Sequence, residues 1–406
     1  MIKSHSTRDC RYTLQHGAGS DAIHQNPQYA YAVCLLNDDS GITGSGFAFT
    51  LGEGNALVCA AIEFYAAQLI GKDIEEIMSS FGAIQNKLAN AQQFRWLGPQ
   101  KGVVHLALAA VTNACFDLWA KKRQVPLWKL LIDLTPDEVV ALLDFSYVED
   151  VLDKGDAKKI LTDALTGKQS RHTILDTGYT AYDTSVGWFH YSDEDIVTNC
   201  RKAIDAGFRA MKLKVGSTDE DRDIRRAMLV RATAGDAITI MLDANQQWRL
   251  DQAIRICHRL KGMNPYWIEE PTHPDDILAH LTLAKEIAPL KLALGEHVPN
   301  SILFKNYLQT GSAGFIQVDA TRVAGVSEFL LISLMSKKFD VPVVPHVGDM
   351  GQLHQHLVLF NHIAADLPAL FLEHIPHLKQ YFTQPVDIAS GVYKTPQEAG
   401  SSCDLK

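Results

Sequence analysis

The chain has 406 residues, a net charge of −9 and 47% hydrophobic residues. This length predicts one large fold or two domains, and the hydrophobic content supplies ample material for a core, which excludes a disordered chain. The acidic balance offers no basic surface for nucleic acid or an anionic membrane, so we expect a small-molecule partner.

The sequence pattern does not predict a secretion signal or a membrane-spanning segment. The opening MIKSHSTRDCRY has no apolar region typical of a secretion signal, and apolar stretches such as VVHLALAAVTNACF are too short or too polar to span a membrane. The seven cysteines are odd in number and contain no CxxC, which is typical of reduced cytosolic thiols. We therefore expect a cytoplasmic protein with no membrane partner.

Residues 1–133 predict an α+β domain. YAYAVCLL and ITGSGFAFTL have the pattern of paired strands around a turn at Asn37-Asp38-Asp39. Helical spacing follows at 58–70 and 103–122, and Pro126 opens a further short helix, WKLLIDL. Residues 134–175 are polar and helical in pattern, and we interpret them as an insertion or as the approach to a second domain.

From Thr180 onward, strand and helix patterns alternate regularly, which predicts parallel strands closing into a β/α barrel. The expected strands are 181–188, 210–216, 238–244, 266–270, 291–296, 315–319, 341–346 and 370–375, and the expected helices are 193–206, 219–234, 251–261, 275–287, 301–309, 326–339 and 352–365.

Charged side chains recur near the ends of these strands, roughly one strand-plus-helix unit apart. In a β/α barrel the carboxyl ends of the strands converge on the active site, so these side chains are expected to meet there. They are Lys212, Lys214, Asp243, Glu269, Glu296, Asp319 and His346.

Three carboxylates end consecutive strands: Asp243, Glu269 and Glu296. Clustered carboxylates repel one another unless a cation lies between them, and an all-oxygen ligand set suits Mg²⁺ better than Zn²⁺. Any one of them alone would more often cap a helix or pair with a surface lysine. Three in register favour a magnesium site.

Lys212 and Lys214 are two residues apart on one strand, so both point to the same face. Each ammonium lowers the pKa of the other, and partial desolvation and a nearby metal ion add to this, which would make one lysine a usable base near neutral pH. A solvated edge strand is the alternative for an isolated KxK pattern. The position one unit before Asp243 favours the catalytic interpretation.

Asp319 and His346 end neighbouring strands, and a carboxylate bonded to one imidazole nitrogen makes the other a general acid or base. Alone, His346 would more often be structural. His354 and His356 resemble a metal motif, but residues two apart on a helix face different directions, so we expect a structural or surface role. Gly44-Ser45-Gly46 lacks the features of a nucleotide-binding loop.

With these residues in this order, the chain resembles the enolase superfamily, mandelate racemase subgroup. Several segments are similar to L-fuconate dehydratases and related acid-sugar dehydratases. The resemblance implies an α/β fold, a (β/α)7β modified TIM barrel over 176–375, with an N-terminal α+β capping domain over 1–133 that is completed by about 376–406. The segments are GSDAIHQNPQYAYAVCLL, TSVGWFHYSDE, MKLKVG, DANQQW, WIEEPTHPDD, GEHVPN and DATRVAGVSE.

The resemblance also implies a role for each site residue. Lys214 would remove the proton α to the carboxylate and Lys212 would stabilise the enolate. His346, oriented by Asp319, would assist departure of the 3-hydroxyl. Mg²⁺ would be held by Asp243, Glu269 and Glu296, with Glu269 rather than Glu270 as the ligand. The expected substrate contacts are Lys212, Asn245, Glu373, Asp21 and Trp188.

The implied activity is a Mg²⁺-dependent hydro-lyase that converts a six-carbon acid sugar, in the first instance L-fuconate, to a 2-keto-3-deoxy acid, in a homo-oligomer. The chain departs from the family in its short ending, KTPQEAGSSCDLK, and in VGDMGQLHQH after His346, where Asp349 adds a charge. L-Galactonate or another aldonate or aldarate, an epimerase, and a non-catalytic sugar-acid-binding or scaffold protein therefore remain alternatives.

Overall fold

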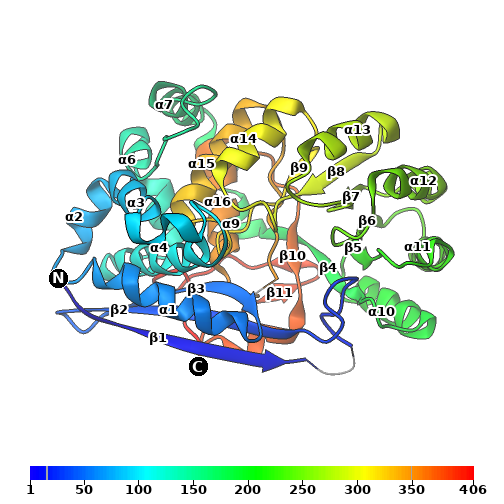
Figure 1. Cartoon of the computed structure of the whole chain (residues 1–406), viewed down its shortest axis with the longest axis horizontal. Coiled ribbons are helices and arrows are strands. Elements are labelled where there is room, and N and C mark those ends of the chain that lie inside the picture. Colours follow the sequence, from blue (N-terminus) through cyan, green and yellow to red (C-terminus); the bar gives the residue numbers. More distant parts are fainter. Residues whose placement is uncertain (15–16, 349) are drawn as a thin grey trace.

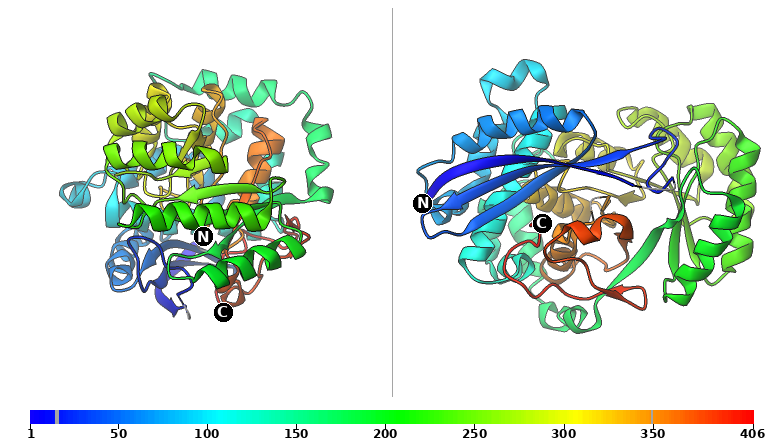
Figure 2. Two further views of the ribbon diagram at one scale, coloured as in Figure 1. Left: turned by 90° about the vertical axis from the view of Figure 1, so that its right-hand side faces the viewer. Right: turned by 90° about the horizontal axis from the view of Figure 1, so that it is seen from below.

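The structure is a computed structural model that describes residues 1–14, 17–348 and 350–406, so the predicted charge of Asp349 lies outside the described residues. A sheet covered by helices occupies one side of the molecule, and a barrel of strands ringed by helices occupies the other (Figures 1 and 2). The N-terminal part of the chain forms the first unit, and the barrel begins after residue 178.

The N-terminal unit is built on an antiparallel sheet in the order β1-β2-β3. The first strand was not predicted, because IKSHSTRDCRYT is mostly polar and partly exposed on both faces and so has no clear alternation. It is held by pairing with β2 along its whole length. The elements are β1 (Ile2–Thr13), β2 (Gln28–Asp38), β3 (Thr43–Leu51), α1 (Gly54–Ala67), α2 (Ile74–Ser79), α3 (Phe81–Ala89), η1 (Gln92–Leu97), α4 (Gly102–Lys122) and α5 (Leu127–Asp133).

Helix α4 is long and apolar enough, by length and composition alone, to cross a membrane, but 89% of its apolar window is buried inside the protein. It packs against β3 at two glycines, because a Cβ at Gly44 or Gly46 would overlap the backbone of Ala114. The Gly44-Ser45-Gly46 stretch therefore allows a helix to approach a sheet closely, which is a structural role.

We expect Gly46→Ala to destabilise the protein by about 1–3 kcal/mol, because the added methyl group must displace the α4 backbone. The midpoint of urea unfolding measures this. Gly54→Ala is the matched control, since a Cβ there meets nothing within 4 Å, and alanine in a helix is favoured over glycine by about 0.5–1 kcal/mol. Equal midpoints for the two variants would contradict the close packing of α4 on β3.

Short helices follow between the N-terminal unit and the barrel. Two of them begin with a reciprocal capping box, Thr135 with Glu138 and Asp153 with Asp156, which satisfies the free N–H groups of the first turn. These helices are α6 (Pro136–Ala141), α7 (Lys154–Asp163), α8 (Lys168–Arg171) and α9 (Ile174–Thr177).

The barrel strands pair in parallel in the order β4-β5-β6-β7-β8-β9, and β10 pairs with β4. The strands are β4 (Tyr179–Gly187), β5 (Ala210–Lys214), β6 (Thr239–Asp243), β7 (Trp267–Glu269), β8 (Lys291–Leu294), β9 (Phe315–Ile316) and β10 (Leu372–His374). The helices around them are α10 (Asp193–Asp205), α11 (Glu220–Ala234), α12 (Leu250–Leu260), η2 (Lys261–Met263), α13 (Ile277–Ile287), α14 (Ser301–Thr310), α15 (Val326–Lys338) and α16 (Leu353–Ala365).

The strand predicted at 341–346 is only partly formed. Residues 341–346 form only a single bridge, between Val343 and Ile316. Pro342 and Pro345 lack the N–H that a ladder requires, so the segment occupies the position of a barrel strand without forming a regular one.

The C-terminal segment, which could not be placed from its pattern, joins the two units. It contains η3 (Pro376–Tyr381), β11 (Ile388–Ala389) and β12 (Val392–Tyr393), and β12 pairs antiparallel with β4 of the barrel. The chain then returns to α4, where buried Asp117 accepts a hydrogen bond from Ser401 N at 2.6 Å and Lys121 pairs with Asp404 at 2.7 Å.

Candidate active site

The barrel register brings the predicted carboxylates together. In the parallel ladders Lys214 is opposite Asp243, and Asp243 is opposite Glu269, so their side chains leave adjacent strands at one level. Glu296 follows the end of β8. Ligand oxygens of Asp243, Glu269 and Glu296 lie within 4.8 Å of one another, and all three residues are buried.

The buried carboxylates of this cluster repel one another, which favours the binding of a cation between them. Burial raises the pKa of Glu269 to about 8, with Asp243 and Glu373 adding to the rise against the opposing charge of Lys212. A bound divalent cation would relieve the repulsion among these groups. The donor set contains oxygen alone, which fits Mg²⁺.

A second acidic group lies beside the first and shares Glu296 with it. Oxygens of Glu270 and Glu296 and a nitrogen of His297 also lie within 4.8 Å of one another. Glu270 is held by Gln246 Nε2 at 2.7 Å and by His297 Nδ1 at 3.0 Å. Both Glu270 and Gln246 have positive φ angles, 40° and 66°. Neighbouring side chains at the end of a strand point to opposite sides, and Glu270 faces Gln246 and His297.

The lysine pair lies directly against these carboxylates. Lys214 Nζ is 2.5 Å from Asp243 Oδ2, and Lys212 Nζ is 2.6 Å from Glu269 Oε1 and 2.8 Å from Glu373. Both ammonium groups are buried.

These contacts correct the expected pKa of the lysines. Burial lowers the pKa of Lys214, but the charges of Asp243, Glu296 and Asp21 together outweigh it and the net shift is upward. Burial also lowers the pKa of Lys212, and the surrounding acidic groups, chiefly Glu269 and Glu373, together raise it well above its ordinary value. The prediction of a lowered pKa considered the neighbouring lysine, desolvation and a nearby metal ion, and left out the direct contacts with carboxylates. Because each lysine occupies a carboxylate oxygen, a metal ion bound there would compete for the same oxygens.

The Asp319–His346 pair is formed, with 2.7 Å between Asp319 Oδ2 and His346 Nδ1. Burial opposes protonation, but Glu296 and Asp319 raise the pKa of His346 to about 10. His346 Nε2 lies 3.2 Å from Glu296 Oε2. The two carboxylates therefore favour the protonated form of this imidazole.

His354 lies on the other side of Asp319, which sequence reasoning missed. Its Nε2 is 3.0 Å from Asp319 Oδ1 and 2.9 Å from Ala320 N. His356 is structural, since its Nδ1 accepts from Trp128 N at 3.1 Å and burial lowers its pKa to about 3. Nothing in the spacing of His354 and Asp319 indicates their contact, because it depends on how α16 packs.

A small cavity of about 70 Å³ opens above these groups. Of the predicted site residues it is lined by Lys214, Glu296 and His346 and by four expected substrate contacts, Asp21, Trp188, Asn245 and Glu373. Sequence reasoning missed the lining residues His24, Tyr29, Phe49, Thr50, Leu51, His297, Arg322, Gly348 and Ile375. Many of these belong to the N-terminal unit, which carries no strand-end signal.

The segment around Asp21 closes one side of this cavity. Asp21 is buried, and its Oδ2 lies 2.9 Å from His24 Nδ1. The neighbouring Ser20 accepts from Phe189 N at 3.0 Å through its carbonyl and from His190 N at 3.1 Å through its hydroxyl. The N-terminal unit therefore contacts the β4–α10 connection of the barrel at this point.

Among the described residues, the indole nitrogen of Trp188 and the amide oxygen of Asn245 line the cavity and are buried without a hydrogen-bond partner. Such atoms are costly unless a ligand or water bonds to them. Glu373 is different, since it accepts from Thr184 Oγ1 at 2.6 Å and Val347 N at 2.9 Å. Burial opposes its charge, but Lys212 and His346 lower its pKa to about 2. Its contact with a substrate stays a prediction.

A capped β/α barrel with buried carboxylates, lysines and a histidine at the carboxyl ends of its strands defines a class of metal-dependent barrel enzymes. Residues 195–406 match the family described as enolase C-terminal domain-like, and residues 18–131 match the N-terminal domain of the mandelate racemase / muconate lactonizing enzyme family. The chain belongs to the enolase superfamily, as its sequence predicted.

Individual relatives extend this result. The chain is 42% identical to human mitochondrial enolase superfamily member 1, over 99% of this chain and 93% of the relative. The crystal structure of that human protein superposes with a TM-score of 0.96, covering 100% of this chain and 94% of the other. L-Galactonate dehydratase from Hypocrea jecorina is 39% identical over 100% of this chain and 92% of the relative.

The predicted magnesium cofactor is confirmed by a further relative. L-Talarate/galactarate dehydratase from Salmonella typhimurium LT2, crystallised with Mg and L-lyxarohydroxamate, is 25% identical, has a TM-score of 0.80, and covers 100% of this chain and 90% of that chain. The present chain has buried acidic groups able to hold such an ion. The assignment of Asp243, Glu269 and Glu296 as its ligands stays a prediction.

Proposed function

We propose that this protein dehydrates a six-carbon acid sugar, removing the C2 proton and the C3 hydroxyl to give a 2-keto-3-deoxy acid. One observation carries the proposal: Lys214 from β5 and His346 from the segment after α15 line the same cavity, with Glu296 of the buried carboxylate cluster beside them. A base and an acid placed around one substrate position are what a β-elimination needs.

Lys214 takes the C2 proton. To do so it must be neutral, and a cation at Asp243 would favour this by replacing the ammonium group against that carboxylate. Mg²⁺ held by Asp243, Glu269 and Glu296 would supply positive charge for the enediolate that proton removal creates. Lys212, buried between Glu269 and Glu373, adds a second positive charge on the same side.

His346 protonates the departing C3 hydroxyl. Asp319 holds the imidazole by its Nδ1, which leaves Nε2 as the nitrogen that carries the transferred proton. The C2–H and C3–O bonds break, a C2–C3 double bond forms and water leaves. The resulting enol becomes the 2-keto acid by taking a proton at C3.

L-Fuconate is the first substrate we propose. Phe49, Leu51 and Ile375 provide apolar surface around the cavity, which suits the terminal methyl group of a 6-deoxy sugar acid. The likeness to an L-galactonate dehydratase makes L-galactonate the second candidate. An epimerase would need Lys214 and His346 to act on opposite faces of C2, and a non-catalytic binder would not need both groups.

A screen of acid sugars with Mg²⁺, following 2-keto acid formation, tests this proposal. We expect L-fuconate to exceed L-galactonate in kcat/KM by roughly 10-fold or more, because the second sugar places a hydroxyl against the apolar wall. The reverse order would overturn the L-fuconate assignment. A C2 epimer as product, or no keto acid from any aldonate or aldarate, would overturn the dehydratase assignment.

A further inference from the structure

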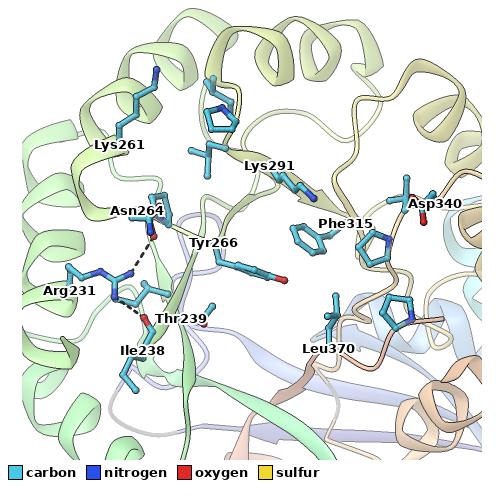
Figure 3. A pocket seen from close by; sticks show the side chains of 18 of the residues that line it. Arg231, Ile238, Thr239, Lys261, Asn264, Tyr266, Lys291, Phe315, Asp340 and Leu370 are labelled. Carbon is cyan, nitrogen blue, oxygen red and sulfur yellow. Dashed lines mark hydrogen bonds between the residues drawn. The ribbon is translucent and has the colours of Figure 1, made fainter. Parts of the chain in front are cut away.

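A much larger cavity lies at the other end of the barrel. Its volume is about 770 Å³, within the range of small-molecule sites. It is lined by residues at or before the starts of β6, β7, β8, β9 and β10, such as Thr239, Tyr266, Lys291, Phe315 and Leu370. Figure 3 shows Tyr266 near its centre, with Phe315 and Lys291 on one side and Arg231 on the other. Asp243, Glu269 and Glu296 lie at or just after the opposite ends of β6, β7 and β8.

Aromatic rings form the base of this cavity. The centroids of Tyr266 and Phe315 are 5.0 Å apart, and both rings contact the buried ring of Trp267, at 5.3 and 5.1 Å. Tyr266 is only partly buried, so part of its ring faces the opening. Prolines with fixed φ angles complete the wall, which gives the cavity a preformed apolar surface. They are Pro265, Pro289, Pro342 and Pro368.

Two cations that line the cavity already have partners within the protein. Arg231 donates to the carbonyls of Met263 at 2.9 Å and Ile238 at 2.7 Å, which holds its guanidinium against the chain. Lys337 pairs with Asp366 at 3.1 Å. These two cations therefore support the wall more than they offer themselves to a ligand.

Lys291 is placed differently. Its Nζ lies 5.3 Å from the centre of the Phe315 ring, and among the described residues it has no carboxylate partner within ion-pair distance. Its stem crosses Gly314, where a Cβ would come within 2.7 Å of Lys291 Cβ. The lysine is thus exposed, aimed over the aromatic base and free to bind an anion.

The remaining lining charges are of both signs. Lys261 is a further cation, and Asp236 and Asp340 are carboxylates. These two carboxylates would repel a polyanion, so a ligand with one anionic group at Lys291 fits the lining better.

We propose that this cavity is a second binding site, which takes a ring-bearing organic monoanion: the ring lies on the exposed part of Tyr266, and the anionic group meets Lys291, whose Nζ lies over the buried ring of Phe315. Trp267 separates the two sites, since its ring contacts the cavity base while its Nε1 donates to Glu269 at 3.0 Å. The proposal does not depend on the reaction at the other end of the barrel.

A matched pair of fluorescent probes tests the site on the full-length protein. 8-Anilinonaphthalene-1-sulfonate is an aromatic monoanion, and N-phenyl-1-naphthylamine has the same ring system without the sulfonate. We expect one molecule of the sulfonate probe to bind per chain. Lys291→Glu should bind the sulfonate probe at least 10-fold more weakly, and the affinity of the same variant for the uncharged probe should change less than 2-fold. Tyr266→Ala should weaken both probes. Lys202→Glu, an exposed lysine on α10, is the control and should change neither.

Circular dichroism melting shows that each variant is folded before its binding is compared. Absence of sulfonate-probe binding, or unchanged binding in Lys291→Glu, would overturn the site. Equal weakening of both probes in Lys291→Glu would also overturn it, because the cavity would then be an apolar cleft without anion selectivity. Excess methanesulfonate should not displace the probe; if it does, the rings contribute nothing to recognition.

Discussion

The Lys214→Ala protein is expected to lose both deuterium exchange at C2 and dehydration, whereas His346→Asn should lose dehydration but retain exchange. Lys214 acts on the C2 proton, so without it no enediolate forms. His346 acts afterwards, on the leaving hydroxyl. Each loss should reach about 10²–10⁴-fold, the usual contribution of a general acid or base. The measurement is the preferred acid sugar in D₂O with Mg²⁺, with exchange followed by NMR and keto acid by colour assay.

Lys202→Ala, on the exposed surface of α10, is the matched lysine control and should match the native enzyme. Exchange that survives in Lys214→Ala but disappears in His346→Asn would reverse the two roles. Dehydration that survives in both variants would remove this acid–base pair from the mechanism.

Glu269→Gln is expected to weaken Mg²⁺ binding far more than Glu270→Gln. Glu269 belongs to the cluster with Asp243, whereas Glu270 is turned toward Gln246 and His297. The loss for Glu269→Gln should exceed the roughly 10–100-fold that removal of an outer partner costs, and Glu270→Gln should stay within that range. Calorimetric titration with Mg²⁺ measures both variants. Because these residues are neighbours of the same type, each serves as the control for the other.

Glu296→Gln should weaken binding sharply in either arrangement, because Glu296 belongs to both acidic groups. Excess chelator should abolish turnover of the native protein, and added Mg²⁺ should restore it. Full turnover in chelator would remove the metal from the reaction. A larger loss in Glu270→Gln than in Glu269→Gln would move the ion to the neighbouring group.

Resemblance and pattern together named residues that the structure brings close to one another. The strand-end positions of Asp243 and Glu269 follow from a local alternation of strands and helices, and the parallel register then places them side by side. The choice of Glu269 over Glu270 came from the resemblance. In the structure the positive φ angle of Glu270 accompanies its different direction.

The amino-acid sequence by itself determined the β/α repeat, the order of the charged residues and the family, because these depend on short-range periodicity and residue type. Only the tertiary structure decided which side chains touch. His354 reaches Asp319 through the packing of α16, the raised pKa of Lys214 comes from its contact with Asp243, and the cavity is closed by residues of the N-terminal unit. The same holds for β1, a polar strand that forms only against β2, and for the large cavity at the other end of the barrel. Contacts between distant segments carry no local signal, since each depends on how whole elements pack.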